Sequence, residues 1–303
     1  MKKKIALTVA CIVLGVMMLV TTAFAGATGN SGYEAYKDAL RKSFESKSFS
    51  TRLDASIKDN GKVLAEASAI IKSNHETMSS VTSVKTNSQE KIMETYVQAD
   101  KTVIRDGESD IYYVIEHKEH SKRHSDRDYE NKYNYEDSKA GETIVDALVG
   151  NMKNYFSLNE KADGSKNVSF QLSGTQIPSV VNVLASVGIR EASKENYRDS
   201  KHMTPFGKDF NFEDIELPKL VDDIRISSVD FDADINKDNI IDSQLTNITV
   251  QGKDASGVEH EVVLSINMDF SDFGITTPDV VDLTGKQVQN IDPEEFEREH
   301  RRD

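Results

Sequence analysis

The segment 234–242 carries the sharpest chemical pattern in the sequence, because its oxygen-bearing side chains are spaced like the ligands of a calcium-binding loop. The residues at loop positions 1, 3, 5 and 9 are Asp234, Asn236, Asp238 and Asp242. Two positions depart from the motif: position 6 is Asn239 instead of glycine, and position 12 is Leu245 instead of a bidentate acid.

The residues that flank this segment alternate between polar and apolar, which is typical of strands, whereas calcium loops of this kind lie between helices. The favoured interpretation is therefore a hairpin turn with Lys237-Asp238-Asn239 at its tip. A calcium site is the less favoured alternative, and its affinity would be of the weak extracellular kind, about 10⁻⁴–10⁻³ M.

Three of the seven histidines, His117, His120 and His124, lie close together. On a helix they would share one face and could bind zinc or copper. However, Lys118, Lys122 and Arg123 stand between them, and these positive charges oppose metal binding. A solvated loop of mixed charge is the favoured interpretation.

The stretch 62–72 predicts a strand with one unusual apolar face of small residues. The residues assigned to that face are Val63, Ala65, Ala67, Ala69 and Ile71. Short side chains there either let a helix pack closely against the sheet or leave an apolar cleft between sheet and helices. Close helix packing is the favoured interpretation of this face, and the apolar cleft is the alternative.

Two predicted helices supply the opposite wall of that cleft. The helix expected over Glu142–Leu158 has an apolar stripe spaced every four residues, and the helix that Pro178 opens, with Gly188 as its expected stop, has another. The helical candidates for contact with an acyl chain or another apolar ligand are Ile144, Leu148, Met152, Phe156 and Leu184.

No catalytic motif accompanies these features. The sequence has no nucleophile elbow, no zinc-protease motif and no glycine-rich phosphate loop. Carboxylate pairs are expected by chance in a chain with 51 Asp and Glu residues. We therefore expect a protein without enzymatic activity and without a cofactor.

The N-terminus indicates export. Lys2-Lys3-Lys4 precedes an uncharged apolar run, Ile5–Phe24, which ends in the cleavage signature Ala23-Phe24-Ala25. Residues 1–25 are accordingly predicted to be a signal peptide, with an uncleaved membrane anchor as the alternative. Cleavage would remove Cys11, the only cysteine, so the mature chain could form no disulfide.

The composition limits the class of partner. The 303-residue chain has a formal net charge of −14, and removal of the three N-terminal lysines makes it −17. Nucleic-acid binding requires clustered positive charge, so a nucleic-acid partner is not expected. Membrane contact is expected only through an uncleaved signal peptide.

The remaining sequence reads as a helix over Gly32–Glu45 followed by a strand meander, and later as the two helices and a second meander. The residues 116–143 lack Val, Ile, Leu, Met and Phe and predict a long polar excursion. A short helical turn is expected at Leu217–Val221, and 284–303 is expected to form a charged C-terminal tail. The predicted fold is a single α+β domain, 32–283, in which helices lie across the concave face of one curved antiparallel sheet.

This order of elements resembles the LolA/LppX-type superfamily of bacterial exported lipoproteins and lipid carriers. The residues that carry the resemblance are Tyr33-Glu34-Ala35-Tyr36, Asp59-Asn60-Gly61 and the run Val258 to Phe270. The resemblance implies an unclosed β-barrel around an apolar cavity for lipid. Many members have a lipobox cysteine, which this chain lacks.

The sequence therefore predicts an exported or cell-envelope protein that binds a lipid or another apolar molecule. The alternative is an extracytoplasmic interaction or adhesion module with a fully packed core, which would bind envelope proteins through exposed strand edges and the polar excursion.

Overall fold

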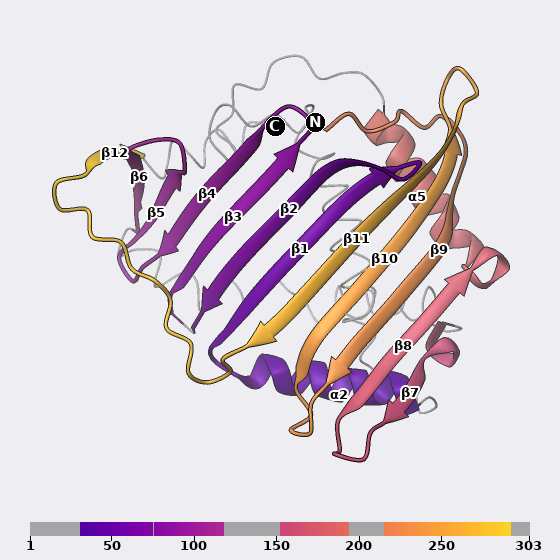
Figure 1. Ribbon diagram of the computed structural model, residues 1–303, viewed down its shortest axis with the longest axis horizontal. Coiled ribbons are helices and arrows are strands. Elements are labelled where there is room, and N and C mark those ends of the chain that lie inside the picture. The colour runs from indigo at the N-terminus through magenta and orange to yellow at the C-terminus, as the bar shows by residue number, and fades with distance from the viewer. Residues whose placement is uncertain (1–30, 75, 118–151, 194–214, 292–303) are drawn as a thin grey trace, which may run out of the picture.

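The computed structural model describes residues 31–74, 76–117, 152–193 and 215–291. Its main feature is one open, curved sheet of 12 strands in the order β12-β6-β5-β4-β3-β2-β1-β11-β10-β9-β8-β7 (Figure 1). All neighbouring strands are antiparallel except β12 and β6, which are parallel. The predicted single, antiparallel-dominated sheet is confirmed, and the sheet does not close.

The first half of the chain contributes one helix and six strands: α2 (Ser31–Glu45), β1 (Phe49–Asp59), β2 (Lys62–Ser73), β3 (Met78–Thr86), β4 (Glu90–Val97), β5 (Lys101–Asp106) and β6 (Ile111–Glu116). The second half contributes η1 (Met152–Tyr155), β7 (Ser157–Glu160), β8 (Lys166–Ser173), η2 (Gly174–Gln176), α5 (Ser179–Ser193), β9 (Asp222–Ile235), β10 (Ile241–Lys253), β11 (Glu259–Ser271) and β12 (Gln287–Ile291).

The turn between β1 and β2 follows directly from its sequence. Asn60 and Gly61 both have positive φ, at 48° and 82°, which is the requirement of the tight hairpin turn that matches the strand twist. The Asn60 side chain also accepts a hydrogen bond from the Glu261 backbone N–H, at 2.9 Å. This turn therefore fixes the register of β1 against β2 and also ties it to β11.

The two meanders join through β1 and β11, which pair over ten residues from Ser50–Ser271 to Asp59–Val262. Apolar residues recur at alternate positions along most of both strands, with Val263 as an exception, so this register places most of their apolar residues on the same face. Ile266 of β11 lies beside Ala55 of β1, for example. The result is one continuous apolar face across both halves of the chain.

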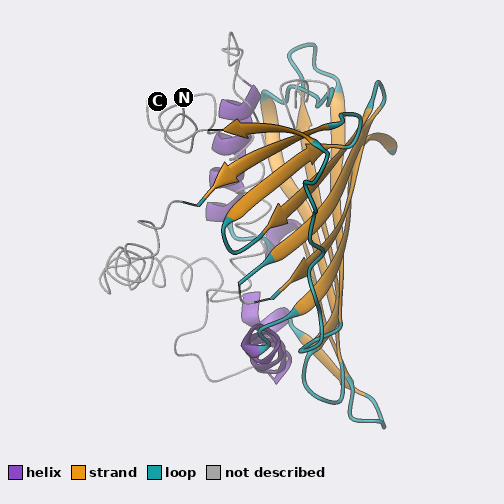
Figure 2. Ribbon diagram, turned by 90° about the vertical axis from the view of Figure 1, so that its left-hand side faces the viewer, coloured by secondary structure: helices purple, strands orange, loops and turns teal. Residues whose placement is uncertain are grey.

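Both described helices lie on this face of the sheet, which we call the helix face (Figure 2). Helix α2 contacts β7 to β10, and α5 contacts β9. The core beneath them centres on an aromatic cluster of Tyr33, Tyr36, Phe156, Phe170 and Phe231. The opposite face is rich in Asp, Asn and Ser, and we call it the polar face.

The end of the predicted helix Glu142–Leu158 has a different structure. Met152–Tyr155 forms one 3₁₀ turn, and a strand begins at Ser157. Phe156 and Leu158 are more buried than Ser157 and Asn159, so the local period is two and sheet pairing with β8 decides the conformation.

The end of one predicted helix and one predicted helical turn were also wrong. Helix α5 continues past Gly188 to Ser193, because an interior glycine weakens a helix without ending it. Leu217–Val221 is not helical. Its Val221 N–H donates to the Lys253 carbonyl at 2.8 Å, so the segment extends the pairing of β9 with β10.

The C-terminal region 284–303 contains a strand where a charged tail was predicted. Gln287–Ile291 pairs with β6 along Ile111–Ile115. The five residues are uncharged and alternate weakly, a signal too short to separate from coil without knowing that β6 offers an open edge.

Several predicted features lie outside the described residues: the signal peptide 1–25, most of the excursion 116–143 with His120 and His124, and the last twelve residues. Within the described ranges, neither helix has the length and apolar character needed to cross a membrane.

Candidate functional site

The alanine-rich face predicted from 62–72 is present on the helix face of β2. Its alanines pair with the apolar residues of β1: Ala65 with Ile57, Ala67 with Ala55, and Ala69 with Leu53. Ala65 and Ala69 are buried, and Ala67 is half-buried. We call the six residues Leu53, Ala55, Ile57, Ala65, Ala67 and Ala69, together with Ile71, the alanine strip.

Val63 does not belong to this strip. A β-bulge shifts the register between Ile57 and Lys58, so that Lys58 pairs with Val63 and Leu64 becomes the extra residue. Leu64 is buried while Val63 is 36% exposed. The assignment of Val63 to the alanine face was wrong because an extra residue reverses the alternation of every side chain before it.

Longer side chains border the strip on both sides. Ala55 lies next to Ile266 of β11, and Ala67 lies next to Val84 of β3. One row across the sheet therefore reads Ile266, Ala55, Ala67, Val84, with the two shortest side chains in the centre. The low relief is confined to this row, because Leu53 and Ile57 stand on either side of Ala55 along β1, and Ala65 and Ala69 pair with Thr86 and Thr82 of β3.

Of the helical residues predicted to face this strip, Phe156 is the one whose side chain is described, and it lies elsewhere. Phe156 is buried in the aromatic cluster, with its ring centroid 4.7 Å from that of Phe170. Since β8 and β2 are five strands apart, roughly 24 Å separates that cluster from the strip. The side chains of Met152 and Leu184 and the whole of Ile144 and Leu148 lie outside the described residues.

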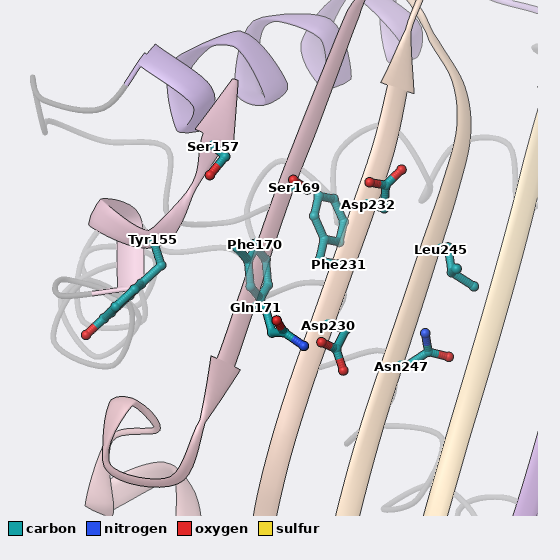
Figure 3. Close-up of a pocket in the computed structure, with 10 residues that line it drawn as sticks. All are labelled: Tyr155, Ser157, Ser169, Phe170, Gln171, Asp230, Phe231, Asp232, Leu245 and Asn247. Atoms are coloured by element: carbon teal, nitrogen blue, oxygen red, sulfur yellow. The ribbon is translucent and has the colours of Figure 1, made fainter. Parts of the chain in front are cut away.

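Two hollows of the described structure lie on the polar face instead. One, of about 430 Å³, is lined mostly by polar residues such as Asp54, Glu66 and Ser68, and its lining also includes Ala55 and Ala67 of the strip. The other, of about 490 Å³, is lined by residues from η1, β7, β8, β9 and β10 (Figure 3). Both are wide open to solvent, and the second combines polar side chains such as Asp230 and Asn247 with the ring of Tyr155.

The segment 234–242 forms the predicted hairpin turn. The Asn236 side-chain oxygen accepts the backbone N–H groups of Asp238 and Ile240, and Asn239 has a φ of 60°. The Asp242 carboxylate accepts a hydrogen bond from the Asn236 side-chain amide, at 2.8 Å. The candidate ligand oxygens thus hold the turn together.

Neighbouring side chains also form hydrogen bonds with a candidate calcium ligand, Asp234. The Asp234 carboxylate accepts from Lys161 at 3.4 Å and from Asn167 at 3.3 Å. Across the described ranges, no three His, Cys, Asp or Glu side chains gather in a way that could hold a metal ion. Of the predicted histidine group only His117 is described, and its Nε2 lies 2.9 Å from the Thr102 hydroxyl.

A charged cluster on the polar face was not predicted from the sequence. The Glu94 carboxylate accepts from Arg105 Nε at 3.0 Å and from the Tyr96 hydroxyl at 2.9 Å. The Arg105 guanidinium also lies 5.7 Å from the ring centre of Tyr112. The strand register puts Glu94 opposite Arg105 and Arg105 opposite Tyr112, so pairing three predicted strands in register would have revealed the cluster.

The contacts within this cluster shift the pKa values of Glu94 and Tyr96. Hydrogen bonding to Arg105 holds the pKa of the Glu94 carboxyl below its ordinary value, against a smaller opposing effect of burial. Burial, with the neighbouring Glu94 carboxylate, raises the pKa of Tyr96 to about 12.

We expect Glu94→Gln to make the acid-induced loss of stability shallower. Because the pKa of Glu94 is lowered in the folded state, the unfolded chain binds its proton first as the pH falls. The stabilisation is complete above the ordinary glutamate pKa and is lost as the pH falls below about 4.5 towards the folded value. Urea unfolding between about pH 6 and pH 3 measures this effect.

The control is Glu66→Gln, an exposed glutamate on the polar face of β2 for which no ion pair is found among the described residues. Equal pH slopes for both variants and the unsubstituted protein would show that the Glu94–Arg105 pair does not stabilise the fold.

Known proteins give no further assignment. No family model matches the chain, and no curated protein matches it. A solved structure from Thermobifida fusca YX, assigned as a thioesterase II, aligns with 7% identity over 83% of this chain and 90% of its own, with a TM-score of 0.12. At that score the likeness supports no conclusion about fold or activity.

Proposed function

We propose that this protein is an exported, non-enzymatic binding protein of the cell envelope, and that its ligand is a lipid or another apolar molecule lying along the alanine strip. In this proposal the helix face is the concave side of the sheet, and helical segments lie across it to enclose the ligand. The predicted signal peptide 1–25 and its cleavage after Ala25 belong to the same proposal.

The observation that carries the proposal is the pair of short side chains at the centre of the strip. Ala55 and Ala67 are directly paired, with Ile266 and Val84 beyond them, and in this proposal a chain of methylene groups lies over the two alanines. Burying such a chain contributes about 0.8 kcal/mol for each CH₂ group.

The placement of the helices also supports this proposal. Helices α2 and α5 contact β7 to β10, and among the described residues neither makes an extensive contact with β1 to β6. The apolar residues of β1 and β2 are therefore not accounted for by the core under α2 and α5, which centres on β8 to β10.

We expect Ala67→Trp to abolish binding of an apolar fluorescent probe, N-phenyl-1-naphthylamine, while the protein stays folded. The indole would occupy the space between Ile266 and Val84 that the probe needs. Because the natural sequence has no tryptophan, the emission of the new indole also reports directly whether its surroundings are apolar.

The matched control is Ser68→Trp, which places the same side chain on the next residue, on the polar face. It should bind the probe like the unsubstituted protein. Unfolding of Ala67→Trp at conditions where Ser68→Trp is folded would show that the strip is packed against another part of the chain. Equal probe binding by all three proteins would contradict the proposed site.

A further inference from the structure

Strand β6, which lies next to the edge strand β12, has a sequence that would favour aggregation if its outer edge were uncovered. Ile111–Glu116 reads Ile-Tyr-Tyr-Val-Ile-Glu, with high β-propensity and a single charge at its end. An open edge of this kind exposes a row of backbone N–H and C=O groups that can pair with another chain. In the described structure β12 covers this edge.

The cover is thin. β12 has five residues, of which the first four are exposed and the last is half-buried. It is also the one parallel strand in the described sheet. Little apolar surface is buried by this pairing, so its detachment costs few side-chain contacts and leaves the core under α2 and α5 intact.

The connection to β12 is long and lightly attached. We call residues 272–286, between the end of β11 and the start of β12, the strap. Figure 1 shows it in yellow, passing the ends of the first strands on its way to the opposite edge of the sheet. Fifteen residues reach at most about 50 Å, and the seven strand spacings from β11 to β12 require about 34 Å.

A few polar contacts hold the strap. At its start, the Gly274 N–H donates to the Ser48 carbonyl at 2.9 Å. In its middle, Asp279 accepts from Lys72 at 2.9 Å, and its backbone N–H donates to the Ser79 hydroxyl at 2.9 Å. At its end, Lys286 lies 5.7 Å from the ring centre of Tyr112. Ile275 and Val280 are 77% and 75% exposed.

We propose that β12 is an exchangeable strand, and that two copies of this chain associate by placing Gln287–Ile291 of each against β6 of the other. The occupant of the β6 edge in the dimer is the same five-residue segment that covers it in the single chain, so every backbone pair is retained. The extended strap supplies the reach, and reciprocal exchange closes the assembly as a two-fold dimer with no open β6 edge.

The test uses two single-cysteine variants of the full chain with Cys11→Ser: Tyr113→Cys on β6 and Gln289→Cys on β12. These positions pair directly, and the spacing of neighbouring strands, about 4.8 Å, lies within the range for a disulfide. Neither variant alone can form an internal disulfide. After mixing and mild oxidation, a disulfide joining the two different chains reports β12 of one chain beside β6 of another.

The control mixture replaces Gln289→Cys with Val280→Cys, whose cysteine lies in the exposed strap. We expect the Tyr113→Cys and Gln289→Cys mixture to give about tenfold more cross-linked heterodimer than the control, because only specific pairing fixes the geometry of the bond. The yield should rise with protein concentration, as measured by non-reducing electrophoresis and mass spectrometry.

The double variant Tyr113→Cys/Gln289→Cys, oxidised in dilute solution, checks that both strands are folded and in register, since it should form the disulfide within one chain. If that internal bond forms and the two-variant mixture gives no more heterodimer than the control at any concentration, β12 does not exchange and the proposal is wrong.

Discussion

Replacing Phe231 with alanine is expected to lower the free energy of unfolding by about 3–5 kcal/mol, the range for removing a large buried aromatic side chain. Phe231 is 3% exposed. Its ring stacks on Phe170 at a centroid distance of 5.1 Å and meets the edge of Tyr36 at 5.0 Å. The substitution therefore leaves a cavity at the contact between β8, β9 and α2.

The comparison for this variant is Phe273→Ala, which removes the same atoms from a half-buried ring whose described aromatic neighbour is Phe49. Urea unfolding curves of both variants give the two losses. A loss for Phe231→Ala no larger than that for Phe273→Ala would mean that the aromatic cluster is not the main core.

Tyr36→Phe is expected to cost about 1–3 kcal/mol, because it leaves a buried acceptor without its donor. The Tyr36 hydroxyl of α2 donates to the side-chain oxygen of Gln244 of β10 at 2.6 Å, and both residues are buried. Burial also raises the pKa of the Tyr36 phenol. The unfolded chain therefore loses its proton first, and this residue lowers stability as the pH rises above about 10.

The double variant Tyr36→Phe/Gln244→Leu separates the two causes. If the loss comes from an unpaired buried acceptor, replacing both partners with apolar groups should recover most of it, and the double variant should be more stable than Tyr36→Phe alone. Tyr36→Phe should also weaken the loss of stability between about pH 10 and pH 12. Additive losses in the two single variants would show that the hydroxyl and the amide are not coupled.

Much of the sheet could be predicted from the sequence, since strands that are polar on one side and apolar on the other carry a clear period of two. Examples are the strands β1, β2, β8 and β11. The turn at Asn60-Gly61, which joins β1 to β2, was also predicted. The prediction failed where pairing partners decide the conformation. Phe156 fits the predicted helical stripe as well as it fits a short strand with Leu158, and β7 forms because β8 is beside it.

The candidate site was predicted in part for the same reason. The alternation of Ala65, Ala67 and Ala69 was enough to place them on one face, whereas nothing in the sequence marks Leu64 as the extra residue of a bulge. The Glu94–Arg105–Tyr112 cluster depends on the register of three strands, which single-strand patterns do not contain. The proposed ligand, the export of the chain and the resemblance to lipid carriers stay predictions.

The pairing of β1 with β11 has a consequence for how the chain reaches its native state. Ser50 must meet Ser271, so the central seam of the sheet cannot form until almost the whole chain is available. Contacts this distant in sequence slow folding. Until β11 pairs with β1, the β1–β6 meander has an exposed edge at β1 in addition to the edge at β6. A newly synthesised or newly exported chain is therefore most vulnerable to aggregation just before the last strands arrive, and we expect its refolding to be slow and limited by this step.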